Sequence, residues 1–208
     1  MRTYIKLGLT ALIAAMLLAS ALSIASARNL EFSNLHFRVE WSRMEFRSAL
    51  VTIRCQLTLE GSFRSRTIPK IERLWIANIT RINIHEPSCT NGRVTPGGTP
   101  PWRLTYENFA GRLPRITQLG LLLQRFQFLI EALGINCTYG TETDSITFSA
   151  ILLREEQITN LQPRVGSNIA NLREGGGLCP STGTLEANAE DGEVTLLNSS
   201  TTVVVRLI

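Results

Sequence analysis

The chain has few of the side chains from which enzymes build catalytic sites. Its 208 residues include only two histidines, His36 and His85, and only two aspartates, Asp144 and Asp191. It contains no H-E-x-x-H or G-x-S-x-G motif, no phosphate-binding glycine loop and no EF-hand loop. These absences exclude the usual signatures of metallopeptidases, serine hydrolases, nucleotide-binding proteins and calcium sensors, and they indicate no cofactor.

Charge of either sign is also scarce. Charged residues make up 18% of the chain and hydrophobic residues 44%, a composition that excludes intrinsic disorder and supplies one core. Lys70 is the only lysine after residue 27, and all other bases there are arginines. Without Arg2 and Lys6 the net charge falls from +4 to +2. That value is too small to indicate a nucleic acid or an anionic membrane surface as partner.

The first 27 residues have the pattern of a signal peptide. A positively charged start precedes an uncharged stretch from Leu7 to Ala27, and Ala25-Ser26-Ala27 matches the small-x-small pattern recognised by signal peptidase. We expect cleavage after Ala27, which leaves residues 28–208. The alternative is an uncleaved membrane anchor, since the stretch is long enough to span a bilayer. In both cases the remainder lies outside the cytoplasm, in the envelope or the medium.

Four cysteines without a C-x-x-C motif indicate disulfides rather than a metal site. In the oxidising compartment of an exported chain, an even number of thiols predicts two disulfides. Zinc is disfavoured because neither histidine lies at ligand spacing from a cysteine. Three connectivities are open. We favour the pairs that close the shorter loops, Cys55–Cys89 and Cys137–Cys179.

Alternation with a period of two dominates the remaining sequence. In Ala49–Leu59 every second residue is apolar, which predicts a half-buried strand with Cys55 on its apolar face. Similar patterns predict strands at Leu35–Trp41, Leu74–His85, Trp102–Phe109, Ile116–Leu123, Phe126–Ile130, Ile146–Leu152, Glu193–Leu197 and Thr202–Ile208. Turn residues such as Asn91-Gly92 and Asp191-Gly192 separate these segments. The pattern predicts one all-β domain over residues 28–208, an antiparallel sandwich or a small barrel.

One segment fits two interpretations. Leu119–Leu133 has apolar residues at helical spacing, but the same residues fit two strands that meet near Gln124-Arg125. We prefer two strands because the flanking sequence is strongly β in pattern.

Two catalytic hypotheses use the few candidates present. His36 or His85 would act as a general base, but both are interpreted as exposed strand residues without a nucleophile partner. Glu60 and Glu107 would serve a secreted hydrolase of envelope polysaccharide, although nothing in the sequence places them together. We therefore assign no catalytic residue, and the hydrolase is the alternative rather than the favoured function.

Basic residues offer a candidate binding surface. Four of them lie close together in the chain, at Arg64, Arg66, Lys70 and Arg73. Arginines bind carboxylates and phosphates through two parallel hydrogen bonds, so an anionic polysaccharide or a phosphate is a candidate ligand. A charged sheet edge that resists aggregation is the plainer explanation.

Tryptophans offer a candidate platform for a sugar. Trp41 falls on the apolar face of its strand, whereas Trp102 follows Pro100-Pro101 and is the best candidate for exposure. The favoured function is a non-enzymatic binding or adhesion module for a glycan or an envelope protein. Its candidate ligand contacts are Arg64, Arg66 and Trp102.

Three segments resemble a group of exported β-rich proteins of actinobacteria. They are CQLTLEGSFRSRT at Cys55–Thr67, PWRLTYENFAGRLP at Pro101–Pro114 and LCPSTGTL at Leu178–Leu185. The resemblance extends over the whole chain and implies export and a disulfide-stabilised β fold. It transfers no catalytic residue.

Overall fold

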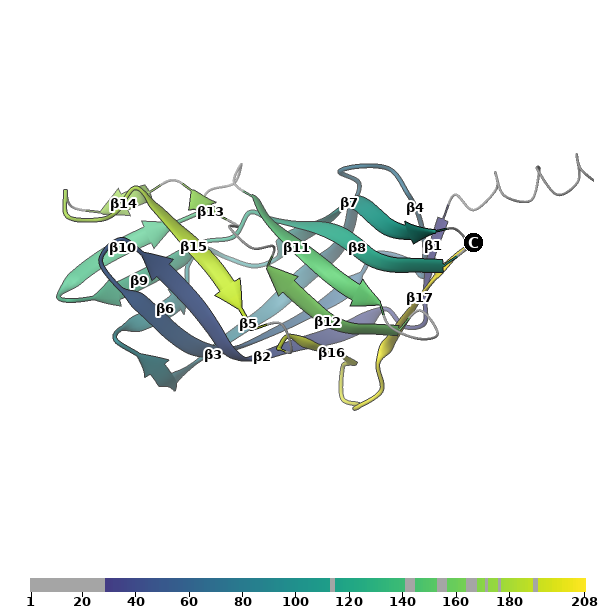
Figure 1. The fold of residues 1–208 in the computed structure, drawn as a ribbon, viewed down its shortest axis with the longest axis horizontal. Coiled ribbons are helices and arrows are strands. Elements are labelled where there is room, and N and C mark those ends of the chain that lie inside the picture. The colour runs from purple at the N-terminus through teal and green to yellow at the C-terminus, as the bar shows by residue number, and fades with distance from the viewer. Residues whose placement is uncertain are drawn as a thin grey trace, which may run out of the picture.

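Eight antiparallel strands close into a barrel (Figure 1). The computed structural model describes residues 29–112, 115–140, 145–152, 157–163, 168–170, 172–175, 177–188 and 191–208. In order around the barrel the strands are β2 (His36–Ser48), β3 (Thr52–Phe63), β5 (Trp75–Thr90), β7 (Trp102–Arg112), β8 (Arg115–Gln124), β11 (Ser145–Leu152), β12 (Gln157–Pro163) and β16 (Glu193–Leu196). The short strand β16 pairs with both β12 and β2, which closes the wall.

The all-β prediction is confirmed, since the described residues form strands and turns and no helix. Of the two architectures left open by the sequence, the sandwich is wrong and the barrel is right. The difference lies in β16, because pairing on both of its edges leaves the eight-stranded wall without the two separate sheets of a sandwich.

The other strands of the described residues extend the barrel at its two ends. β1 (Asn29–Phe32), β17 (Val203–Leu207) and β4 (Thr67–Pro69) continue from β12, near the carboxyl terminus in Figure 1. β15 (Thr182–Ala187) and β13 (Asn168–Ala170) continue from β2. A second sheet at the opposite end has the order β14 (Leu172–Gly175), β10 (Ile135–Tyr139), β9 (Phe128–Ala132) and β6 (Arg93–Pro96).

Apolar side chains fill the interior of the barrel. Alternate residues of each strand point inward, among them Phe37 and Val39 of β2 and Leu57 and Leu59 of β3, all of them buried. The hollow between Phe37 and the neighbouring apolar side chains measures about 20 Å³, which is space for about one water molecule. A ligand the size of a sugar therefore has no place at this point of the interior.

Trp102 lies inside the fold, and the expectation that it is exposed is wrong. Its side chain is only 1% exposed and packs edge-to-face against Phe126 and Phe128 at centroid distances of 6.4 and 5.2 Å. Phe128 also meets Phe46 of β2 at 5.1 Å. The second sheet thus packs its aromatic residues against the end of the barrel where β7 begins, and it covers Trp102.

Both expected disulfides are present. Cys55 pairs with Cys89 and Cys137 with Cys179, at Cα–Cα distances of 4.2 and 5.8 Å. The first bridge joins β3 to β5, and the second joins β10 of the second sheet to the segment before β15. Two disulfides are consistent with a place outside the cytoplasm.

The preference for two strands over a helix at Leu119–Leu133 is also confirmed. β8 ends at Gln124 and β9 begins at Phe128, with Arg125 in the left-handed region at φ 61° between them. A residue at positive φ separates the two strands, and a right-handed helix does not contain this conformation.

The predicted signal peptide falls on residues 1–27, which lie outside the described residues. Within the described residues, no helix is long and apolar enough to cross a membrane. Division of the chain into a signal peptide and one domain therefore stays a prediction.

A tight contact at Gly192 ties β16 to its neighbours. Gly192 has φ 81°, and a β-carbon at this position would clash with the carbonyl oxygen of Leu161 and with Nε1 of Trp41. Gly192 directly precedes β16, and its carbonyl accepts the N–H of Leu161 at 2.8 Å. Only glycine satisfies both the positive φ and the close approach.

We expect Gly192→Ala to destabilise the protein by about 3 kcal/mol, because it adds backbone strain and a clash at the closing strand. Gly134→Ala is the matched control. Gly134 has φ 76° but nothing within 4 Å of the added carbon, so its substitution should cost about 1 kcal/mol. Urea unfolding of both variants measures the difference. Equal losses would show that the contact at Gly192 is unimportant.

Candidate functional site

A hollow of about 520 Å³ opens on the outer wall of the barrel where β2, β3 and the end of β5 come together. Polar side chains dominate its lining, which consists of Ser42, Arg43, Arg54, Cys55, Ser88, Thr90 and Asn91. We call it the arginine groove. Its volume falls within the range of small-molecule sites.

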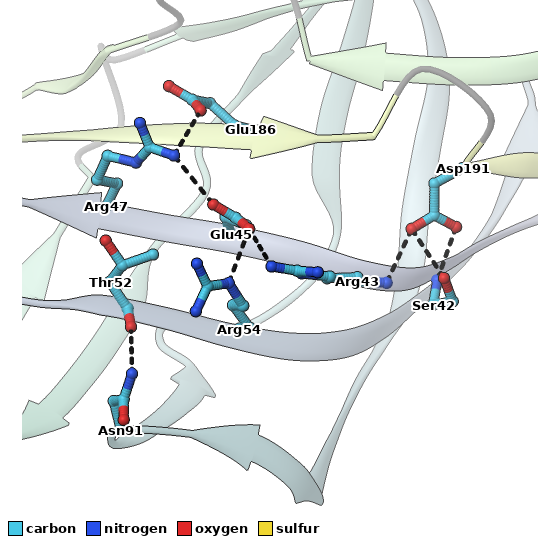
Figure 2. Close-up of polar contacts among 9 residues, drawn as sticks. All are labelled: Ser42, Arg43, Glu45, Arg47, Thr52, Arg54, Asn91, Glu186 and Asp191. Atoms are coloured by element: carbon cyan, nitrogen blue, oxygen red, sulfur yellow. Dashed lines mark hydrogen bonds and ion pairs between the residues drawn. The ribbon is translucent and has the colours of Figure 1, made fainter.

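Glu45 organises the arginines beside the groove (Figure 2). Its Oε1 accepts a hydrogen bond from Nε of Arg54 at 2.8 Å and lies 3.0 Å from an Arg43 guanidinium nitrogen. Its Oε2 accepts from Arg47 at 3.1 Å, and Arg47 also reaches Glu186 at 3.2 Å. Three guanidinium groups thus face two carboxylates on one patch of the wall.

The arrangement places the negative charge beneath and the positive charge outside. The Glu45 side chain is 13% exposed, whereas those of Arg43 and Arg54 are 48% and 38% exposed. The hydrogen bond from Arg54, followed by that from Arg47, holds the pKa of Glu45 below its usual value. A covered carboxylate therefore orients guanidinium groups whose remaining N–H donors point to solvent.

Arg43, Glu45 and Arg47 belong to β2, and this strand contains a bulge just before Met44. The register with β3 shifts between Trp41 and Met44, so both of these side chains enter the core although they are three residues apart. The carboxylate of Asp191 accepts the N–H groups of Ser42 and Arg43 in the bulge, each at 2.8 Å (Figure 2). Bulges commonly re-aim side chains in this way.

The opposite rim comes from the end of β5. Asn91, at φ 66°, and Gly92 form the turn to β6, which confirms the turn expected at Asn91-Gly92. Nδ2 of Asn91 donates to the carbonyl of Thr52 at 3.1 Å, so the side chain is held across the start of β3. The Cys55–Cys89 disulfide joins the two strands next to the groove.

The side chains of this site match an anion. Within the described residues, no three histidine, cysteine, aspartate or glutamate side chains gather as a metal site. Arg43 and Arg54 offer planar sets of N–H donors that match a carboxylate, sulfate or phosphate. Hydroxyl and amide groups around them match the hydroxyls of a sugar.

Of the four residues in the predicted basic segment, Arg64 belongs to a different surface, which we call the Trp75 stack: Arg64, Trp75 and Arg103. The guanidinium carbons of Arg64 and Arg103 lie 4.2 and 4.4 Å from the centroid of the half-buried Trp75 ring. Nearby in the chain, Nζ of Lys70 lies 4.8 Å from the ring centroid of Phe109. Cations over aromatic faces attract the ring quadrupole. Trp75, rather than Trp102, is thus the tryptophan that contacts the predicted Arg64.

Arg66 lies apart from the Trp75 stack. It lines a hollow of about 240 Å³ beside β1 and β17, together with Glu31 and Arg206. The structure therefore separates Arg64 from Arg66, which the sequence had joined as one contact surface. Arg73 lies next to Glu72, with 3.9 Å between its Nε and a carboxylate oxygen.

The candidate catalytic residues are not brought together as pairs. Glu60 is buried and forms two ion pairs. Its Oε1 lies 2.6 Å from Nη2 of Arg38, and its Oε2 lies 3.1 Å from Nη1 of Arg81. The hydrogen bond with Glu60 raises the pKa of Arg38. Glu107 belongs to β7, which β5 separates from the strand of Glu60. An arginine-bound carboxylate is poorly placed to protonate a leaving group.

The two histidines lie on different parts of the wall. His36 is exposed and opposite Ser62, whereas His85 is half-buried and opposite Gln56. Six residues of β3 separate these positions, about 20 Å along the strand. They do not form a common site.

Sequence interpretation missed Arg43, Glu45 and Arg47 because the predicted strand ended at Trp41. The missing signal is the Arg-x-Glu-x-Arg spacing at positions 43, 45 and 47. In a strand, such a period of two places all three side chains on one face.

No protein-family model, curated protein sequence or solved structure matches this chain. The geometry of the site is therefore the evidence for its role.

We expect the ion pairs of Glu45 to make stability depend on pH. Because the folded-state pKa of Glu45 is lowered, its contribution is present above the unfolded pKa and is lost as pH falls through the folded pKa. Glu45→Gln should cost about 2 kcal/mol near neutral pH and less below about pH 4. Unfolding in urea at both pH values measures this change.

Glu72→Gln is the matched control for this experiment. Its carboxylate belongs to an ion pair with 70% and 79% exposed side chains, and such pairs contribute little. A Glu45→Gln penalty that stays constant down to acid pH would contradict the role of its charge.

Proposed function

We propose that this protein is an exported, non-catalytic binding module that recognises an acidic glycan through the arginine groove. The observation that carries the proposal is the pair Arg43 and Arg54, oriented by the covered carboxylate of Glu45 at the rim of a polar hollow. Export is supported by the signal-peptide pattern of residues 1–27 and by two disulfides. A bacterial origin of the actinobacterial type rests on the sequence resemblance alone.

The chemistry of the groove favours a sugar that carries an anionic group. Arginine forks recognise a carboxylate or a sulfate, and the open polar rim allows a chain of sugars to enter and leave. Serine, threonine and asparagine make up most of the remaining lining, and their hydroxyl and amide groups can bind the hydroxyls of sugars. Contact with an envelope glycan is therefore a better match than carriage of a hydrophobic ligand.

A polysaccharide hydrolase is the second function considered, and no observation favours it. Such an enzyme needs two carboxyl groups on either side of the scissile bond, about 5 to 10 Å apart. Glu60 is bound by two arginines and Glu107 lies on another strand. The clustering of arginines supports the proposed binding role.

Binding of the purified protein to three soluble polymers tests the proposal. Polygalacturonate carries carboxylates, dextran sulfate carries sulfates and dextran is neutral. We expect binding to one or both acidic polymers and none to dextran, as measured by calorimetry. The tighter of the two acidic polymers identifies the anionic group, and binding to neither polymer would reject the function.

Arg54→Gln should weaken binding of the acidic polymer by about tenfold, the effect of losing one charge-assisted contact. Arg112→Gln is the matched control, because Arg112 is an exposed arginine at the end of β7, away from the groove lining. Equal losses in both variants would indicate unspecific attraction of charge rather than a site. Thermal unfolding of both variants verifies that the fold is retained.

A further inference from the structure

We infer that the ligand is a linear acidic polysaccharide that lies along the outer face of β3 and reaches both the arginine groove and the Trp75 stack. This inference rests on the proposed function and adds the length and direction of the bound chain. It concerns the outward residues of one strand, between Arg54 at its start and Arg64 just beyond its end.

The length of β3 sets the span between the two sites. Arg54 and Arg64 are ten residues apart in the sequence, which corresponds to about 33 Å of extended strand. A single sugar cannot bridge that distance, whereas an oligosaccharide of several units can. The two sites therefore select for a polymer.

The wall between the two sites is polar throughout. From Arg54 onward, every second residue of β3 points outward, namely Gln56, Thr58, Glu60 and Ser62. Their cross-strand neighbours are polar as well: Glu40 and Asn83 flank Thr58, and His85 lies opposite Gln56. Thr58 and Glu60 themselves are covered, at 9% and 8% exposed. Between Gln56 and Ser62 a sugar chain therefore meets the exposed side chains of the flanking strands, which include Asn83 and Glu40, the latter paired with Arg38 at 3.5 Å.

Arginines also occupy the middle of the path. Arg38, Glu60 and Arg81 form one row across β2, β3 and β5. Glu60 is buried between them, whereas the Arg81 side chain is 74% exposed and that of Arg38 is 34% exposed. This row repeats the motif of the arginine groove, in which a covered glutamate orients exposed guanidinium groups.

The far end of the path is built to hold arginines rather than the face of a sugar. Arg64 and Arg103 reach Trp75 from strands on either side of β5. Since each guanidinium lies over the ring, its N–H donors remain at its edges, where they can bind an anion. Arg103 also belongs to a row of polar residues that are paired across β3, β5, β7 and β8, namely Ser62, Asn78, Arg103 and Gln124.

Three arginine sites that follow one another along β3, with arginines from β3 and its neighbours, favour a ligand with repeated charges. Once one acidic sugar is bound, the next site meets its own sugar at a high effective concentration, so affinity rises with chain length. A ligand with one charge would use only a single site. Because the three sites are spaced along the wall, weak contacts at each of them together favour a polymer over a single sugar.

The test compares galacturonic acid, short oligogalacturonates and long polygalacturonate on the same protein. If dextran sulfate is the tighter polymer, its sulfated oligosaccharides replace them. We expect Kd per binding site to fall by at least tenfold from the short oligomers to the long polymer. A constant Kd over all lengths would overturn the inference.

Variants at the far end separate this inference from the proposed function. Arg64→Gln should weaken the long polymer about tenfold and leave the short oligomers unchanged, while Arg54→Gln weakens both. Arg112→Gln is the control for unspecific attraction and should alter neither. If Arg64→Gln has no effect while Arg54→Gln still does, the groove stands and the path along β3 is wrong. If no acidic glycan of any length binds, both proposals fail.

Discussion

The dipeptide Asp191-Gly192 joins the strands on which both the fold and the candidate site depend. The Gly192 carbonyl accepts the N–H of Leu161, and the carbonyl of Asp191 accepts Nδ2 of Asn160, so β12 is held on one side. The Asp191 carboxylate accepts the bulge N–H groups of β2 on the other side. Ser42 and Arg43 lie between the part of β2 that pairs with β16 and the part that pairs with β15, and the carboxylate supplies acceptors for their backbone N–H groups there. Closure of the barrel follows from this bridge between β12 and β2.

The same bridge shapes the arginine groove. With the bulge held by Asp191, Trp41 and Met44 both face the core and Arg43 is displaced toward the groove. Trp41 is fixed further by its Nε1, which donates to the carbonyl of Leu161 at 2.9 Å. Barrel closure and placement of the arginines are therefore consequences of one set of hydrogen bonds, and a change in either would alter the other.

Because the interior of the barrel is packed, the proposed binding site lies on its outer wall. Apolar side chains fill the centre of this barrel, as in small barrels in general. Phe128 of the second sheet and Phe126, which precedes that sheet, cover one end. Polar and charged residues remain on the outer wall, where the partly buried Glu45 and the buried Glu60 each form ion pairs with arginines. A charge with several partners is oriented at less entropic cost than an isolated surface pair.

Local pattern in the sequence by itself determined the strand class and the turns, and the even number of cysteines predicted two disulfides. The pairing of the cysteines was favoured but left open by the sequence, and the structure decided it. Period-two alternation and turn residues act over a few neighbours, so strands such as Thr52–Phe63 and the turn at Asn91-Gly92 can be predicted from sequence. Only the tertiary structure decided that the wall closes, that Trp102 is covered, and that Arg64 and Arg66 lie in different places. These outcomes depend on contacts between residues far apart in the chain, such as Asp191 with Ser42 and Trp102 with Phe128. Alternation sets the face on which a side chain lies, but the neighbour across that face comes from strand order and register.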